Sequence, residues 1–176
     1  EVQRVKLAVI EAEWHTQKPP ASITVFGIPN EEAQRTDYAV KIPWMLGLIA
    51  TRSVDEKISG IIDLKKEAAA RIRNGMVAYE ALQKLRTGDK SPDTRQSFEL
   101  RKKDLGYSLL LRKYTPNVMD ATDEQIARAA ADTIPRVAPL FWAFRIMVGI
   151  GFLLLFLFCA TFYFLAVRNL ATDEKF

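Results

Sequence analysis

The sequence contains a single cysteine, Cys159, and a single histidine, His15. Cys159 lies inside a long apolar run, so the chain has neither a disulfide nor a thiolate metal site of its own. The sequence also lacks a glycine-rich phosphate loop, a nucleophile elbow and the Cys/His spacing of a zinc site. These absences give little support to a soluble enzyme of the nucleotide-binding, hydrolase or zinc-dependent classes.

Charge of one sign is not concentrated in any segment. The net charge is +4, and Lys and Arg alternate with Asp and Glu, so the sequence shows no basic stripe for nucleic acid. Nearly all of the charge lies in residues 1–136, whereas residues 137–167 contain one charged residue, Arg145. No initiator methionine or signal peptide precedes this pattern, and we therefore expect a piece of a longer protein.

A long apolar run occupies residues 146–167. Its 22 residues include five Phe and no charge, and as a helix they would span roughly 33 Å. The alternative, a buried helix of a large soluble protein, is disfavoured because the run has no polar face to turn toward water. The sequence therefore predicts a transmembrane helix over residues 137–168, with Pro139 in its first turn.

The residues that flank this helix indicate its orientation. Arg168 and Lys175 follow it, whereas Arg136 precedes it with Asp132 nearby. Because Lys and Arg are enriched on the cytoplasmic side, we expect a cytoplasmic tail at 169–176. The region before the helix would then be extracytoplasmic.

The region that precedes the transmembrane helix is expected to be mainly helical. Two adjacent apolar stripes predict a helix over 1–16, buried on much of its circumference. Residues 17–53 are expected to be irregular or extended. The predicted fold class is therefore all-α, with an extracytoplasmic helical domain followed by one transmembrane helix that belongs to a larger membrane bundle.

A helical hairpin is predicted over 54–114, with a Gly- and Pro-containing turn between its helices. Gly60 and Gly75 weaken its first helix and suggest a break. A short helix over 122–132 follows, and it opens on the capping-box sequence TDEQ. Residues 1–136 are thus expected to form one region ahead of the membrane.

Lys6 and Glu11 interrupt the apolar surface of the first predicted helix. Being five residues apart, they would lie about 140° apart on a helix, so they do not form a simple surface ion pair. One interpretation is a buried pair satisfied by other parts of the protein. The other is a polar pocket at the membrane surface, where Glu accepts protons and Lys holds an oxygen or an anion. His15 is interpreted as a solvated or capping residue.

Arg145 and Met147 lie at the entrance to the transmembrane helix. Arg145 is either an interfacial anchor or the partner of a carboxylate, a lipid phosphate or a heme propionate. Met147 is either apolar filler or a soft ligand for a low-spin heme iron. Ala143 and Gly151 share its helix face, and these small residues leave room for a flat partner.

Several segments together resemble subunit I of the cytochrome bd-type ubiquinol oxidases. The resemblance covers almost the whole chain in the same order, and it rests on VKLAVIEAEW at 5–14, FGIP at 26–29, IP at 42–43, LIATRSVD at 48–55, RIRNGM at 71–76, KDLGY at 103–107, RKYTPNV at 112–118, IPRVAPL at 134–140 and FRIM at 144–147. The family couples quinol oxidation to the reduction of dioxygen to water and builds a proton gradient.

The resemblance implies roles for four residues. Lys6 and Glu11 match a lysine and a glutamate implicated in quinol binding and oxidation, and residues 1–136 match the long form of the periplasmic quinol-binding loop. Met147 matches an axial ligand of the low-spin heme b, and Arg145 matches an arginine close to that heme. His15 matches no heme ligand of the family.

Much of the family's machinery is expected outside this sequence. The second ligand of the low-spin heme and the ligands of the high-spin heme b and of heme d have no match here, so the chain alone is not expected to turn over. The implied partners are the rest of subunit I, subunit II, small subunits, ubiquinol and the lipid of a bacterial inner membrane, without nucleic acid. The alternatives are a single-span anchored interaction domain without catalytic activity and, with less support, a membrane-span sensor.

Overall fold

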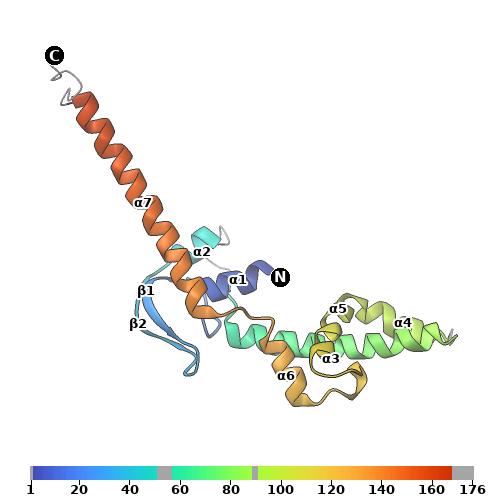
Figure 1. Ribbon diagram of the computed structural model, residues 1–176. Coiled ribbons are helices and arrows are strands. Elements are labelled where there is room, and N and C mark those ends of the chain that lie inside the picture. Colours follow the sequence, from blue (N-terminus) through green and yellow to red (C-terminus); the bar gives the residue numbers. More distant parts are fainter. Residues whose placement is uncertain (1, 51–56, 89–90, 168–176) are drawn as a thin grey trace.

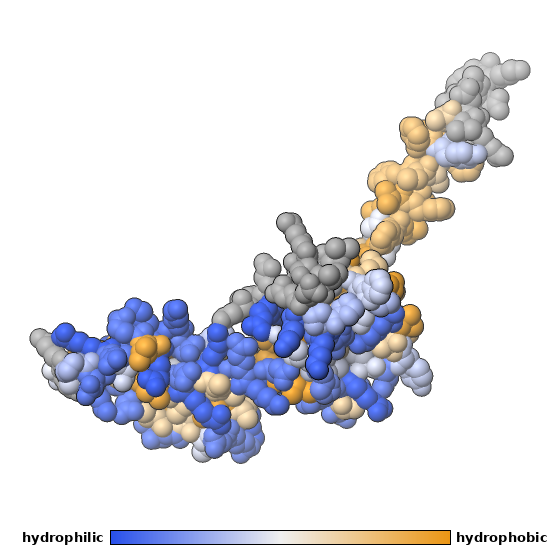
Figure 2. All heavy atoms as spheres, turned by 180° about the vertical axis from the view of Figure 1, so that it is seen from behind, coloured by the Kyte–Doolittle hydropathy of each residue, from blue (hydrophilic) through white to orange (hydrophobic). Residues whose placement is uncertain are grey.

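The computed structural model describes residues 2–50, 57–88 and 91–167, and it consists of a mainly helical domain from which one long helix projects (Figure 1). This helix, α7 (Val137–Val167), follows the predicted transmembrane range. Its segment Val137–Ala166 is long and apolar enough to cross a membrane, and the other described residues do not bury its most apolar part. Figure 2 shows the same contrast, with an apolar rod rising from a largely hydrophilic body.

The remaining elements confirm a mostly helical protein and add one small sheet. In chain order they are α1 (Val2–Ile10), β1 (Ile23–Asn30), β2 (Arg35–Ile42), α2 (Met45–Ala50), α3 (Ile61–Arg86), α4 (Pro92–Arg101), the 3₁₀ turn η1 (Lys102–Asp104), α5 (Leu105–Ser108), the 3₁₀ turns η2 (Leu109–Lys113) and η3 (Val118–Asp120), and α6 (Asp123–Ala131). The predicted short helix over 122–132 is thus α6, with its capping box formed.

The first helix is shorter than the predicted range 1–16, which is corrected here. The amide of Glu13 donates to the Ala8 carbonyl at 2.9 Å, and the amide of Ala12 donates to the Val9 carbonyl at 3.1 Å. Ala12 has a φ of 49°, in the left-handed region. This pair of bonds around a left-handed residue is a Schellman motif, which ends a helix and reverses the chain.

Residues 17–53 were expected to be irregular or extended, and the extended parts are β1 and β2, whose pairing was not predicted; the segment Met45–Ala50 is instead the helix α2. These strands form an antiparallel hairpin whose register shifts between Thr24 and Phe26 and again between Phe26 and Ile28. Such bulges interrupt the alternation of apolar and polar residues by which a strand is recognised in sequence. The turn contains Gln34 at a φ of 50°, where the usual turn signal would be Gly or Asn.

In the described part of the chain, two larger apolar cores and a smaller one, formed by Ala21, Leu46 and Ile58, hold the domain together. The first joins α1 and α3 to the base of α7 and consists of Ala8, Val9, Ala12, Trp14, Ile61, Leu64, Val137 and Phe141. The second lies between α3, the turns η2 and η3, and α6, and it consists of Ala68, Ile72, Leu111, Val118, Ile126, Ala129 and Ala130. Because the first core contains residues from both ends of the chain, it fixes the position of α7 relative to α1.

The helical hairpin is present, and its first helix, α3, is continuous through Gly75. The suggested break at this glycine was therefore wrong. A Cβ at Gly75 would lie 2.3 Å from the carbonyl oxygen of Asp104, so glycine allows the returning segment to pack closely on α3. Gly60, at the N-cap of α3, likewise allows close packing, because a Cβ there would lie 2.3 Å from the carbonyl carbon of His15. Residues 54–56 and 89–90 of the predicted hairpin lie outside the described residues.

Candidate functional site

The Arg145 guanidinium, in the third turn of α7, points into the domain and not into the membrane. Four backbone carbonyls accept hydrogen bonds from it, namely Val25 at 3.1 Å from Nε, Ile10 at 2.8 Å and Phe141 at 3.1 Å from Nη1, and Thr24 from Nη2. The guanidinium carbon also lies 3.4 Å from the centroid of the Phe141 ring. Arg145 thereby ties α7 to the end of α1 and to β1 at one point.

The fifth hydrogen-bond acceptor of this guanidinium is the Glu11 carboxylate, whose Oε2 lies 3.5 Å from Nη2. Glu11 is 2% exposed, and the same Oε2 accepts a hydrogen bond from the Thr24 amide at 2.9 Å. Burial raises the pKa of Glu11 above its ordinary value of 4.5, against the opposing effects of the Thr24 amide and of Arg145. A carboxyl of this kind exchanges protons closer to neutral pH than an exposed one does.

A second buried carboxylate, Glu13, lies beside the first. Its side chain is 10% exposed, and its Oε2 lies 3.2 Å from the Lys41 ammonium on β2 and accepts a hydrogen bond from Gln17. Glu11 and Glu13 would point to different sides of a continuous helix. The reversal after α1 instead brings both carboxylates into the space between α1 and the β1–β2 hairpin.

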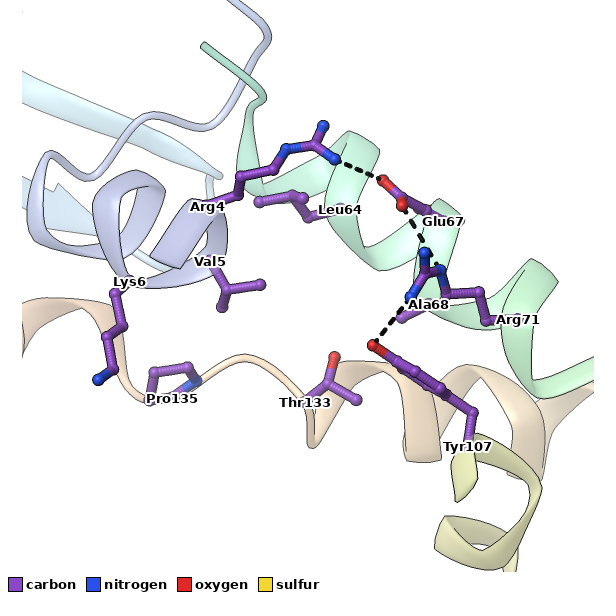
Figure 3. Close-up of a pocket in the computed structure, with 10 residues that line it drawn as sticks. All are labelled: Arg4, Val5, Lys6, Leu64, Glu67, Ala68, Arg71, Tyr107, Thr133 and Pro135. Atoms are coloured by element: carbon purple, nitrogen blue, oxygen red, sulfur yellow. Dashed lines mark hydrogen bonds and ion pairs between the residues drawn. The ribbon is translucent and has the colours of Figure 1, made fainter. Parts of the chain in front are cut away.

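Lys6 lies apart from this cluster. It is exposed on α1 and contributes to a cavity of about 290 Å³ between α1, α3, α5 and the segment before α7 (Figure 3). The cavity is lined by Arg4, Val5, Lys6, Leu64, Glu67, Ala68, Arg71, Tyr107, Thr133 and Pro135. Among the contacts of the described residues, none joins Lys6 to Glu11.

A chain of polar contacts forms one wall of the cavity in Figure 3. Glu67 on α3 receives ion pairs from Arg4 at 3.7 Å and from Arg71 at 3.5 Å. Arg71 also donates to the Tyr107 hydroxyl at 3.4 Å, and its guanidinium lies 5.3 Å from the centroid of that ring. The cavity therefore combines an apolar floor with a cationic edge.

Met147 follows Arg145 by two residues and lies on a different side of α7. Side chains two positions apart on a helix point about 200° away from each other, so Met147 is directed away from the domain that Arg145 enters. Its side chain is 61% exposed. One turn further on, a Cβ at Gly151 would meet nothing within 4 Å, and Ala143 one turn earlier is exposed. This open face fits the approach of a flat ligand to the thioether.

The model of the family described as cytochrome bd terminal oxidase subunit I matches residues 1–173. The chain belongs to this family. It is also 41% identical over 155 residues to the cytochrome bd-II ubiquinol oxidase subunit 1 of Escherichia coli (strain K12). The aligned region covers 88% of this chain and 30% of that relative, so the chain spans about a third of the relative's length. The resemblance seen in the sequence segments is confirmed.

In this cytochrome bd subunit I chain, the structure brings Glu11 and Arg145 together and leaves Lys6 and Met147 on separate surfaces. Sequence reasoning missed Thr24, whose amide and carbonyl bind both members of the pair, because backbone groups leave no signal in a sequence. It also missed Glu13, although the spacing of two acidic residues in EAEW on an otherwise apolar helix was a usable signal. In the part of the chain that the structure describes, no group of three His, Cys, Asp or Glu could hold a metal.

Proposed function

We propose that the chain forms the quinol-oxidising part of a terminal oxidase, in which ubiquinol is oxidised at the periplasmic face and dioxygen is reduced to water elsewhere in the complex, with a proton gradient as the result. The observation that carries this proposal is the buried Glu11 carboxylate, held beside Arg145, two residues ahead of Met147. Membership in the family and the printed name of the Escherichia coli relative support it.

Glu11 acts as the proton acceptor in this proposal. Quinol oxidation releases two protons with two electrons, and a carboxylate whose pKa is raised toward neutral is suited to receive a proton. Arg145 stabilises the ionised carboxylate and so keeps it available. The Lys6 ammonium donates a hydrogen bond to a quinol oxygen in this proposal. Lys6 lies at the edge of the 290 Å³ cavity, on the side of α1 that faces away from Glu11.

In this proposal the Met147 thioether would hold a low-spin heme b as one of the ligands of its iron. The exposed thioether and the space at Gly151 are compatible with that group. When bound, a heme accepts electrons one at a time. In this proposal Arg145 would lie near a heme propionate, while its guanidinium donates to four backbone carbonyls and to Glu11 in the structure.

The remaining parts of the proposal lie outside the chain. The second axial ligand, the high-spin heme b and heme d belong to the rest of subunit I, which assembles with subunit II and small subunits in a bacterial inner membrane. Residues 1–136 are placed in the periplasm. The cytoplasmic tail proposed for 169–176 lies outside the described residues.

The test of the heme assignment is optical. In the full-length oxidase, Met147→Leu should abolish or convert the low-spin heme b spectrum, whereas Ile146→Leu, at the neighbouring exposed position, should leave it unchanged. An unchanged spectrum in Met147→Leu contradicts the assignment.

The test of the quinol site separates two activities. Glu11→Ala should reduce quinol oxidation while oxygen reduction with artificial electron donors persists. Equal loss of both activities would assign Glu11 a structural role. If neither variant changed spectrum or activity, an anchoring domain without catalytic activity would be the better description.

A further inference from the structure

The turn between β1 and β2 contacts the beginning of α7 through one side chain. Glu31 Oε1 accepts hydrogen bonds from the backbone amides of Val137 at 2.9 Å and of Ala138 at 3.1 Å. These are the first two residues of α7, whose amides have no partner within the helix. A carboxylate is favoured there because it also faces the positive end of the helix dipole. Glu31 therefore caps a helix more than one hundred residues later in the chain.

Three further contacts continue along the same strand and helix. The Phe26 ring meets the Trp142 ring edge to face, with centroids 5.6 Å apart, and the carbonyls of Thr24 and Val25 accept from Arg145. Residue numbers fall along the hairpin as they rise along α7, so β1 runs antiparallel to the first three turns of that helix (Figure 1). We name these residues the β1–α7 contact: Thr24, Val25, Phe26 and Glu31 with Val137, Ala138, Trp142 and Arg145.

The β1–α7 contact positions the Thr24 backbone between Glu11 and Arg145. The Thr24 amide binds the Glu11 carboxylate, and the Thr24 carbonyl binds the Arg145 guanidinium that pairs with Glu11. Movement of β1 along α7 would therefore take the Thr24 amide away from the carboxylate and the Thr24 carbonyl away from the guanidinium. Arg145 fixes one end of the contact, and Glu31 fixes the other.

We propose that Glu31 is a positioning residue for quinol oxidation, which holds β1 in register with α7 and so keeps the Thr24 amide on Glu11 and the Thr24 carbonyl on Arg145. This inference rests on the proposed function of Glu11. Glu31 touches neither the substrate site nor Met147 in the structure; its effect passes through Thr24. What matters for this role is the reach of the side chain to two amides, more than its charge.

Two conservative variants of the full-length oxidase separate reach from charge. Glu31→Asp keeps the charge but is one methylene shorter, so its carboxylate no longer reaches both amides. Glu31→Gln loses the charge but keeps an oxygen at the same distance. Glu32→Asp, at the neighbouring exposed position, is the matched control.

The first readout is hydrogen–deuterium exchange of peptides that cover 23–42 and 137–145. Glu31→Asp should exchange about fivefold faster there, as expected for the loss of one helix cap, and Glu31→Gln should stay near the wild type. The second readout is steady-state quinol oxidation, in which Glu31→Asp should raise the KM for quinol severalfold with little change in kcat.

Equal exchange in Glu31→Asp and Glu32→Asp would overturn the inference, and so would a greater effect of Gln than of Asp in both readouts. Faster exchange without a change in KM would also overturn it, since the contact would then be structural only. The exchange measurement does not depend on quinol. If Glu11→Ala left quinol oxidation unchanged, the proposed function would fail while the β1–α7 contact could still be judged.

Discussion

Arg145 and Glu11 are 134 residues apart in the chain, and their charged groups lie 3.5 Å apart inside the domain. Both side chains are largely buried, at 12% and 2% exposure. The guanidinium is satisfied mainly by backbone carbonyls, so the pair depends on the exact course of α1 and β1 as well as on its own charges. This dependence leads to the first two predictions.

Arg145→Ala should destabilise the protein by about 3–5 kcal/mol, because it leaves a buried carboxylate and several carbonyls without a donor. Arg145→Lys should recover only part of this loss. The three nitrogens of the planar guanidinium donate to carbonyls in different directions, and a single ammonium group cannot reach all of them. Denaturant unfolding of the purified full-length protein measures the difference. Arg136→Ala, at an exposed arginine just before α7, should change stability by no more than about 0.5 kcal/mol.

The pH dependence of stability should report Glu11. Burial raises the pKa of Glu11 in the folded state above 4.5, so the folded protein holds a proton that the unfolded chain releases. The free energy of unfolding should therefore fall as pH rises from 4.5 through the folded-state pKa, and Glu11→Gln should remove this fall. Unfolding midpoints of both proteins between about pH 4 and 8 test it, with the exposed Glu32→Gln as control. Parallel curves for wild type and Glu11→Gln would refute the prediction.

Gly75→Ala should disrupt the packing of α5 on α3. The added methyl would lie 2.3 Å from the Asp104 carbonyl oxygen, which belongs to backbone and cannot rotate away. We expect a loss of about 1–3 kcal/mol, measured by thermal unfolding. Gly106→Ala is the control, because a methyl there meets nothing within 4 Å and alanine favours a helix. Equal effects at the two glycines would show that helix propensity, and not contact, is decisive.

Thr122→Ala should weaken α6 by about 1 kcal/mol through loss of its capping box. The Thr122 hydroxyl accepts from the Gln125 amide at 3.3 Å, and the Gln125 side chain accepts from the Thr122 amide at 3.0 Å. Hydrogen exchange of a peptide covering Asp123–Ala131 measures this loss. Thr122→Ser retains the hydroxyl and should behave as the wild type, so a comparable effect of serine would implicate the methyl group instead.

The features that the sequence predicted well are those that local pattern determines. The apolar run of α7 has no polar face, and the capping box at Thr122 needs only residues within one turn. The end of α1 was predicted wrongly because the left-handed residue that ends it is Ala12, and alanine does not signal a helix end in a sequence as Gly or Asn does. The hairpin was missed because two bulges disrupt its alternation.

The candidate site could be predicted only residue by residue. Glu11 and Arg145 each stood out as charges on apolar helices, but their pairing depends on a contact between distant parts of the chain. One interpretation of the sequence placed Lys6 and Glu11 in one polar pocket. The structure places Lys6 on the cavity side of α1 and Glu11, which follows the end of α1, on the hairpin side.

The first core has a consequence for the order in which the protein matures. Residues of α1 and α3 are synthesised well before Val137 and Phe141, yet all of them share that core. The first core therefore cannot close before α7 has been synthesised, and until then the Glu11 carboxylate lacks the Arg145 guanidinium. The packing of α1 and α3 in this core is completed only by a helix from the far end of the described chain.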